Sequence, residues 1–318
     1  MRGVAVETIR EPTVEGGAAT SVAAELVALA RDLWVLFKPG VMQLVLFTSL
    51  VALLLAPGAR HPILSVAVMV ALAGGAAASA AINNWYDSDI DRVMARTRRR
   101  PTAAGRVAPE EALVVGVVLA GLSVAVMGLA GGWLAASLLT ATIAFYVLVY
   151  TIWLKRRTPR NIVIGGAAGA LPPLVAWVAV SGTVDPLPLA MFLVIFLWTP
   201  PHFWALALYR VGDYAKVGVP MLPVVVGKER TATQISLYAG ATGAASLVPL
   251  ATGELGAVYG AAASLLAVRF VQLARHLRRT GSDVVANRLF RFSILYLFAL
   301  FAAMLVDRAV ANSVPAGW

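Results

Sequence analysis

The chain has 318 residues, of which 60% are apolar and only 13% are charged, and its formal net charge is +10. Soluble proteins carry roughly 25% charged residues. With a mean hydropathy of +0.81, the composition excludes a disordered chain, a collagen and an ordinary soluble enzyme, and it predicts an all-α polytopic membrane protein. The chain contains no cysteine, which excludes disulfide scaffolds, thiolate catalysis and zinc–thiolate sites.

The chain begins with a polar segment, residues 1–32, which we expect to be flexible and cytoplasmic. Glu7, Glu11, Glu15 and Glu25 interrupt this segment, so it matches neither a secretory signal peptide nor a mitochondrial transit peptide. We therefore expect a bacterial plasma membrane as the location. A transmembrane domain is expected over residues 33–310, followed by a short external tail, residues 311–318.

The apolar segments that follow are long enough to cross a bilayer, which needs about 20 residues per helix. Nine segments qualify, at about 35–56, 63–86, 112–130, 133–152, 162–181, 188–208, 233–252, 255–273 and 290–309. Gly131 and Gly132 separate the third segment from the fourth, where we expect a tight turn. The sequence therefore predicts a bundle of nine transmembrane helices.

Lysine and arginine gather in alternate loops, which sets the expected orientation. The basic loops lie around 87–111, 153–161, 209–232 and 274–289, whereas the opposite loops hold Arg60, with Arg308 beside the C-terminus. Because cytoplasmic loops carry the excess of Lys and Arg, these basic loops and the N-terminus are expected to be cytoplasmic and the C-terminus external. For residues 275–288, a topology signal is the favoured interpretation of the charge.

Acidic residues are scarce, and three of them follow the second predicted span. In a continuous helix, Asn83, Asp87 and Asp91 would form one polar stripe, while Asp89 would point elsewhere. Carboxylates at this depth are costly unless they are paired or bind a metal, and oxygen ligands suit Mg²⁺. The alternative is a helix end whose acids pair with the arginines that follow.

Basic residues lie next to this stripe and in the following cytoplasmic loops. Arg92, Arg96, Arg98, Arg99, Arg100 and Arg106 come directly after it, and Lys155, Arg156 and Arg157 lie one loop further on. Guanidinium groups beside a divalent cation favour a diphosphate site. A third polar cluster contains Asp213 and Lys216; it could assist a second Mg²⁺, and a salt-bridged loop is about as good an interpretation.

Two pairs of prolines, 172–173 and 200–201, interrupt predicted spans and indicate a local cavity. His202 follows the second pair. A membrane histidine is a functional hypothesis, and His202 could be a haem ligand, a base or a hydrogen-bonded core residue. Asn161 opens the fifth span and could help to bind a polar head group.

These residues resemble the UbiA superfamily of intramembrane prenyltransferases. The stripe Asn83-x₃-Asp87-x₃-Asp91 matches the superfamily's first aspartate-rich motif, and longer runs are similar to the branch that modifies haem. These runs are NNWYDSDIDRVMART at 83–97 with RP at 100–101, YTIWLKR at 150–156, TPRNIVIGGAAGA at 158–170, WTPPHFWALAL at 198–208 and DYAKVGVPMLPV at 213–224, with KP at 38–39. The resemblance covers roughly residues 33–310.

The resemblance implies a nine-helix bundle with a central cavity and an Mg²⁺-dependent farnesyl transfer. The farnesyl group of farnesyl diphosphate would go to the 2-vinyl group of haem b, giving haem O for haem A biosynthesis, with a haem A synthase as the expected protein partner. The metal ligands would be Asn83, Asp87 and Asp91. The diphosphate would contact Lys38, Arg96, Arg100, Lys155, Arg156 and Asn161.

The resemblance also implies catalytic roles for Asp87, Asp91, Asp213, Lys216 and His202, with His202 as the candidate haem contact. The second aspartate-rich motif of the superfamily usually carries two or more aspartates, but this chain has only Asp213 there before Glu229. That difference leaves a second Mg²⁺ without a full ligand set.

Two other functions compete with this interpretation. A related prenyltransferase could act on an aromatic or quinone-precursor acceptor, although the runs at 198–208 and 213–224 favour haem. A secondary transporter or a haem-handling membrane carrier could also contain broken helices, but the acids here cluster at one membrane face. Nucleic acid is not an expected partner, because the basic residues are spread over alternate loops.

Overall fold

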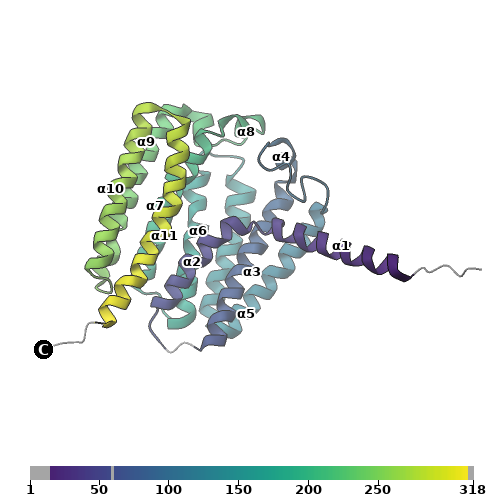
Figure 1. Ribbon diagram of the computed structural model, residues 1–318, viewed down its shortest axis with the longest axis horizontal. Coiled ribbons are helices and arrows are strands. Elements are labelled where there is room, and N and C mark those ends of the chain that lie inside the picture. The colour runs from purple at the N-terminus through teal and green to yellow at the C-terminus, as the bar shows by residue number, and fades with distance from the viewer. Residues whose placement is uncertain (1–14, 59–60, 314–318) are drawn as a thin grey trace, which may run out of the picture.

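In the computed structural model of this chain, residues 15–58 and 61–313 are described, and all their regular elements are helices (Figure 1). Arg60, the first 14 residues and residues 314–318 lie outside the described residues. The elements are α1 (Glu15–Leu36), α2 (Pro39–Leu55), α3 (Pro62–Tyr86), α4 (Ser88–Val93), α5 (Pro109–Ala144), the π-helix η1 (Phe145–Leu154), α6 (Asn161–Ser181), α7 (Pro186–Leu208), α8 (Val211–Lys216), α9 (Leu222–Ala245), the 3₁₀ helix η2 (Val248–Thr252), α10 (Ala257–Thr280) and α11 (Asp283–Ser313). The predicted all-α class is confirmed.

The long helices run side by side in one bundle, and the short helices α4 and α8 lie together at one end of it (Figure 1). Helix α1 crosses the bundle at a steep angle; its second half, residues 24–36, meets α2 with a bend of 59°. Residues 15–32, predicted as a flexible segment, thus form most of a helix. The predicted division into domains stays a prediction.

The number of membrane crossings depends on how broken helices are counted. In the part of the chain that the structure describes, seven helical segments are long and apolar enough to cross a membrane, and an eighth is added if the bent pair 24–36 and 39–55 counts as one. One of the seven, Pro109–Leu154, has 46 residues, more than twice the length that a bilayer needs. Nine crossings would require this segment to cross twice, so nine stays a prediction.

Glycine and proline act differently in these helices. Gly132 has φ 83° and ψ 165°, a non-helical conformation, so the predicted break beside Gly131 is confirmed. The proline pairs 172–173 and 200–201, in contrast, are buried inside helices that continue through them. The prediction that they interrupt the spans is wrong, because a neighbouring helix can shield the backbone groups that proline leaves free.

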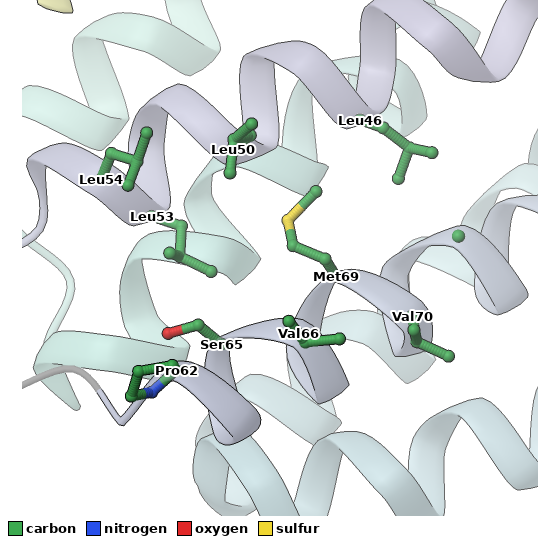
Figure 2. Close-up of a pocket in the computed structure, with 10 residues that line it drawn as sticks. Leu46, Leu50, Leu53, Leu54, Pro62, Ser65, Val66, Met69 and Val70 are labelled. Carbon is green, nitrogen blue, oxygen red and sulfur yellow. The ribbon is translucent and has the colours of Figure 1, made fainter.

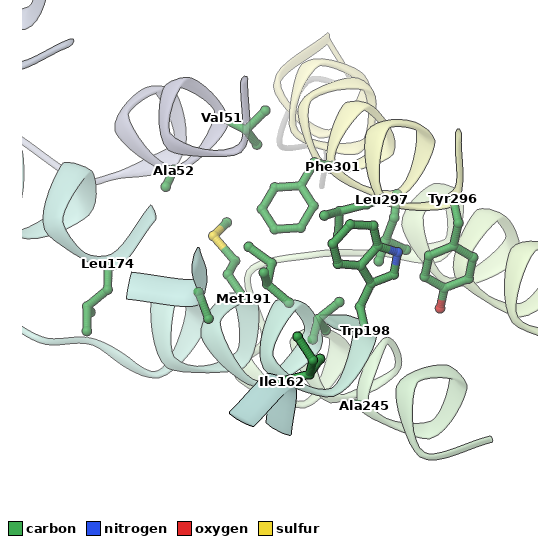
Figure 3. Packing of buried hydrophobic residues seen from close by; sticks show 14 of the residues in the cluster. Val51, Ala52, Ile162, Leu174, Met191, Trp198, Ala245, Tyr296, Leu297 and Phe301 are labelled. Atoms are coloured by element: carbon green, nitrogen blue, oxygen red, sulfur yellow. The ribbon is translucent and has the colours of Figure 1, made fainter. Parts of the chain in front are cut away.

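The core lies around α7, which packs against α6, α9 and α11. Figure 3 shows Met191 and Trp198 of α7 beside Leu297 and Phe301 of α11, with Val51 and Ala52 of α2 nearby. The Trp198 indole donates to the carbonyl of Ser293 at 2.8 Å. This bond satisfies a polar group that would be costly to bury alone, and it fixes α7 against α11.

Two grooves indent the bundle. The first, about 650 Å³, lies between α2 and α3, where Leu46, Leu50 and Leu53 face Val66 and Met69 (Figure 2). The second, about 640 Å³, lies between α1 and the loop containing Arg99 and Arg106. Neither groove is lined by Asp87 or Asp91, so the predicted central cavity stays a prediction.

Candidate functional site

The predicted stripe lies where α3 ends. Asp87 has φ −92° and ψ 3° and separates α3 from α4, so the prediction of one continuous helix through Asp91 is wrong. The three side chains nevertheless remain together in the interior, because Asn83, Asp87 and Asp91 are 3%, 0% and 2% exposed. We call these three residues the aspartate cluster.

Each member of the aspartate cluster contacts a different cation. The Lys38 ammonium donates to Asn83 Oδ1 at 2.5 Å, Arg100 pairs with Asp91 at 2.6 Å, and Lys155 pairs closely with Asp87. The cations come from the α1–α2 corner, from the loop after α4 and from the loop after η1. Three segments that are distant in the sequence therefore meet at the end of α3. The predicted diphosphate contacts of Lys38, Arg100 and Lys155 stay predictions.

A fourth cation, Arg156, lies at the rim. Its guanidinium donates to both carboxylate oxygens of Asp89 at 2.7 and 2.8 Å and to the carbonyl of Tyr86 at 2.6 Å. The Arg156 hydrogen bonds lower the pKa of Asp89, and the same bonds raise the pKa of Arg156. Asp89 thus points away from the cluster, as predicted, and fixes Arg156 within 3.8 Å of Asp87 Oδ1.

Lys38 is held in an uncommon backbone conformation. It has φ 56° and ψ 56°, and the left-handed region costs about 1–2 kcal/mol for a residue other than glycine. Two contacts offset this cost: the Lys38–Asn83 hydrogen bond and the bond from the buried Asn84 amide to the Leu36 carbonyl at 2.8 Å. The neighbouring asparagines therefore fix the α1–α2 corner and bring the ammonium of Lys38 into the site.

The sequence predicted no role for the π-helix η1, although its second half, residues 150–154, lies in the matching run 150–156. Thr151 is fully buried and accepts a hydrogen bond from the Asn83 amide at 3.2 Å. Tyr146 and Tyr150 stack at a tilt with centroids 5.3 Å apart, and π-helices are frequent at functional sites. The sequence signal was the position of Tyr150 and Thr151 in that run, just before Lys155.

Three other predicted site residues are not bonded to the aspartate cluster in the described structure. Lys216 is exposed and Asp213 is half-buried, both on α8. Arg96 is exposed. Within the described residues, no hydrogen bond or ion pair joins Asp213, Lys216 or Arg96 to the cluster. Their predicted contacts stay predictions.

Asn161 has a structural role at the start of α6. It is fully buried, and its amide donates to the carbonyl of Thr158 at 2.7 Å. This bond fixes the turn that carries Lys155 and Arg156. The Asn161 Oδ1 atom is buried without a hydrogen-bond partner among the described residues, so it keeps an acceptor available beside that turn.

His202 lies between aromatic rings. Its imidazole stacks on Trp198 at 4.2 Å and on Phe290 at 4.7 Å between centroids, and Nδ1 is 2.6 Å from Ser293 Oγ. These contacts agree with the interpretation of His202 as a hydrogen-bonded core residue. They leave Nε2 without a hydrogen-bond partner in the described part of the chain, so the predicted haem contact is not tested.

The donor set of the cluster can be compared with what a magnesium ion needs. Asp87 Oδ1 is buried and accepts no hydrogen bond within the described residues, which makes it an open ligand position. In the described ranges, no three side chains of the His, Cys, Asp and Glu types come together as a metal site. The cluster instead offers two such side chains, Asp87 and Asp91, together with the amide of Asn83. Two carboxylates and an amide suit Mg²⁺, which keeps waters and takes phosphate oxygens as its other ligands. The residues fit that ion.

The family model of the UbiA prenyltransferase family matches residues 45–304. The chain belongs to this family. The matched region contains the entire aspartate cluster, Lys155 and His202, and excludes Lys38.

Two curated relatives are similar to this UbiA chain over most of its length. A protoheme IX farnesyltransferase of Parvibaculum lavamentivorans is 53% identical over 283 residues, which cover 88% of this chain and 89% of the relative. A protein of the same name from Rhizobium rhizogenes is 52% identical over 292 residues, covering 91% and 92%.

Three solved structures share the UbiA fold at low identity. A digeranylgeranylglyceryl phosphate synthase superposes with a TM-score of 0.73, at 18% identity over 88% of this chain and 98% of that one. A UbiA homologue from Aeropyrum pernix gives 0.67, at 20% identity over 83% and 96%. A homologue from Archaeoglobus fulgidus, bound to DMAPP and Mg²⁺, gives 0.64, at 19% identity over 86% and 99%. These structures show the fold alone.

Proposed function

We propose that this chain transfers the farnesyl group of farnesyl diphosphate to the 2-vinyl group of haem b, giving haem O. The observation that carries the proposal is the aspartate cluster with its cations, in a UbiA chain that is 53% identical to a protoheme IX farnesyltransferase. Breaking the bond to an allylic diphosphate requires stabilisation of the leaving negative charge, and this site supplies several cations at one point.

Different residues would bind the metal and the diphosphate. Asp87 and Asp91, with Asn83, would hold Mg²⁺, which when bound neutralises diphosphate charge. Arg100 and Lys155 neutralise Asp91 and Asp87, and Lys38 contacts the neutral amide of Asn83. With a metal bound to the cluster, these three cations would be available to diphosphate oxygens. Arg156, held by Asp89, faces the same point with a fixed guanidinium. The buried site also limits the access of water to the reacting carbon atoms.

His202 is the proposed contact for haem. A ring held on both faces by Trp198 and Phe290 keeps one orientation, and its Nε2 atom is the group that would reach the iron or the region near the vinyl group. Asp213 and Lys216 are proposed to close over the diphosphate from α8, which lies at the same end of the bundle as α4 (Figure 1).

The proposed location is the bacterial plasma membrane. The end of the bundle with α4 and α8 would face the cytoplasm, since the basic loops gather there, and the C-terminus would be external. A haem A synthase, which would consume haem O, is the proposed protein partner.

The acceptor is tested by product analysis. The chain is purified in detergent and incubated with Mg²⁺, farnesyl diphosphate, haem b and an aromatic acid as a competing acceptor, and the extracted products are identified by mass spectrometry. We expect a hydroxyethylfarnesyl haem as the main product. Prenylation of the aromatic acid with haem b unchanged would contradict the proposal and assign the chain to the alternative acceptor class.

A further inference from the structure

Helix α10 has a cationic face that the proposed reaction does not use. The basic residues on this face are Arg269, Arg275 and Arg279, with Gln272 and His276 between them; all five are exposed. At 100° per residue, the five side chains fall within about a third of the helix circumference. We call the three arginines and these two neighbours the α10 stripe.

The α10 stripe continues an apolar face toward the other end of the helix. Leu265 and Val268 are 73% and 57% exposed, and they lie on the same side as Arg269. Figure 1 shows α10 at the outer edge of the bundle, away from α2 and α3. In a membrane-spanning helix, exposed leucine and valine on an outer face contact lipid chains, so the α10 stripe faces lipid as well.

The position of Arg269 along α10 indicates how deep its side chain starts in the membrane. It lies 11 residues before Thr280, where α10 ends, which is about 16 Å along the helix. Arg269 lies within the predicted span 255–273, about 6 Å from the end of that span at the basic side. A lipid-facing arginine at such a depth extends toward the head groups and needs an anionic partner.

The chain offers little negative charge to this face. Within the described residues, no ion pair or side-chain hydrogen bond involves Arg269, Arg275 or Arg279. Asp283, at the start of α11, already forms an ion pair with Lys228, with 2.7 Å between Nζ and Oδ1. The arginines at the aspartate cluster differ, because Arg100 and Arg156 each pair with a carboxylate.

We propose that the α10 stripe binds the head group of an anionic phospholipid. The phosphate would lie between Arg275 and Arg279, Arg269 would extend up to it from below, and the acyl chains would lie along Leu265 and Val268. Each Lys or Arg near the membrane surface adds to the attraction for anionic lipid. This binding site is independent of the farnesyl transfer proposed above.

The test is a lipid titration of the full chain in detergent, followed by native mass spectrometry. Dioleoylphosphatidylglycerol is compared with dioleoylphosphatidylcholine, for the parent chain and for the triple variant Arg269→Gln/Arg275→Gln/Arg279→Gln. We expect the parent to prefer phosphatidylglycerol and the triple variant to bind it at least about tenfold more weakly. The single variant Arg269→Gln should lose affinity severalfold.

A charge-matched control separates a site from a general effect of net charge. Arg92→Gln/Arg98→Gln/Arg99→Gln removes three exposed cations at the same end of the bundle and should leave the affinity for phosphatidylglycerol unchanged. The proposal is overturned if the stripe variant binds phosphatidylglycerol like the parent. It is equally overturned if the control loses as much affinity, or if the parent binds phosphatidylcholine as tightly.

Discussion

At the scale of single residues, Asp87 and Lys155 form the pair on which the site depends. Asp87 is completely buried and the Lys155 side chain is 18% exposed. A buried charge that loses its partner destabilises a protein far more than the intact pair stabilises it. Lys155 therefore offsets the free-energy cost of burying the Asp87 carboxylate when no substrate is bound.

Replacing Lys155 with methionine should lower the free energy of unfolding by about 3–5 kcal/mol, because the Asp87 charge stays buried without its partner. The double variant Asp87→Asn/Lys155→Met should recover most of that loss, since neither charge remains. Thermal unfolding in detergent measures both. Equal stability of the single and double variants would show that the two residues are not coupled.

The Asp89–Arg156 pair makes a pH-dependent contribution. Its hydrogen bonds lower the pKa of Asp89 from the ordinary value of 3.8, so the folded state binds that proton less readily than the unfolded state. The contribution is fully present above pH 3.8 and is lost as the pH falls through the lowered pKa. Asp89→Asn should therefore reduce stability at neutral pH, and its difference from the parent should vanish in acid; a constant difference would contradict this.

His202 gives a spectroscopic prediction. If its Nε2 atom ligates haem iron, His202→Phe, which keeps the stacking on Trp198 and Phe290, should change the visible spectrum of added haem b. His276→Phe, an exposed histidine on α10, should leave that spectrum unchanged. An unchanged spectrum for His202→Phe would exclude His202 as the iron ligand.

At the scale of elements, the close crossing of α3 and α5 positions the end of α3 that carries the cluster. A Cβ atom added at Gly116 of α5 would lie 2.5 Å from Ile82 and 3.1 Å from the backbone oxygen of Ala78. Backbone cannot move aside as a flexible side chain can, so glycine at this position allows the two helices to approach.

Gly116→Ala should destabilise the protein by about 1–3 kcal/mol through overpacking. Gly121→Ala is the matched control on α5, since nothing lies within 4 Å of its added Cβ, and it should be neutral or stabilise the helix by up to about 1 kcal/mol. Thermal unfolding compares the two. A loss of stability at Gly121 equal to that at Gly116 would contradict the close-packing argument.

At the scale of the whole molecule, hydropathy and turn chemistry predicted the helical class and the break at Gly132. Spacing also identified the buried residues Asn83, Asp87 and Asp91. It could not predict that α3 ends at Asp87. It also could not predict the ion pairs of the two carboxylates, because Arg100 and Lys155 come from different loops. The sequence also could not predict the hydrogen bond from Lys38 to Asn83, since that bond depends on the left-handed backbone conformation of Lys38 at the α1–α2 corner.

The central claim is that the aspartate cluster drives farnesyl transfer to haem b, and the most direct measurement is the initial rate of haem O formation by Asp87→Asn. Removing one group that stabilises charge in a transition state costs about 10²–10³ in rate, so we predict a loss of at least about a hundredfold. A metal chelator should produce a similar loss in the parent. Asp283→Asn, an exposed and ion-paired control, should keep the parental rate. Haem O formed by Asp87→Asn at the parental rate would contradict the account.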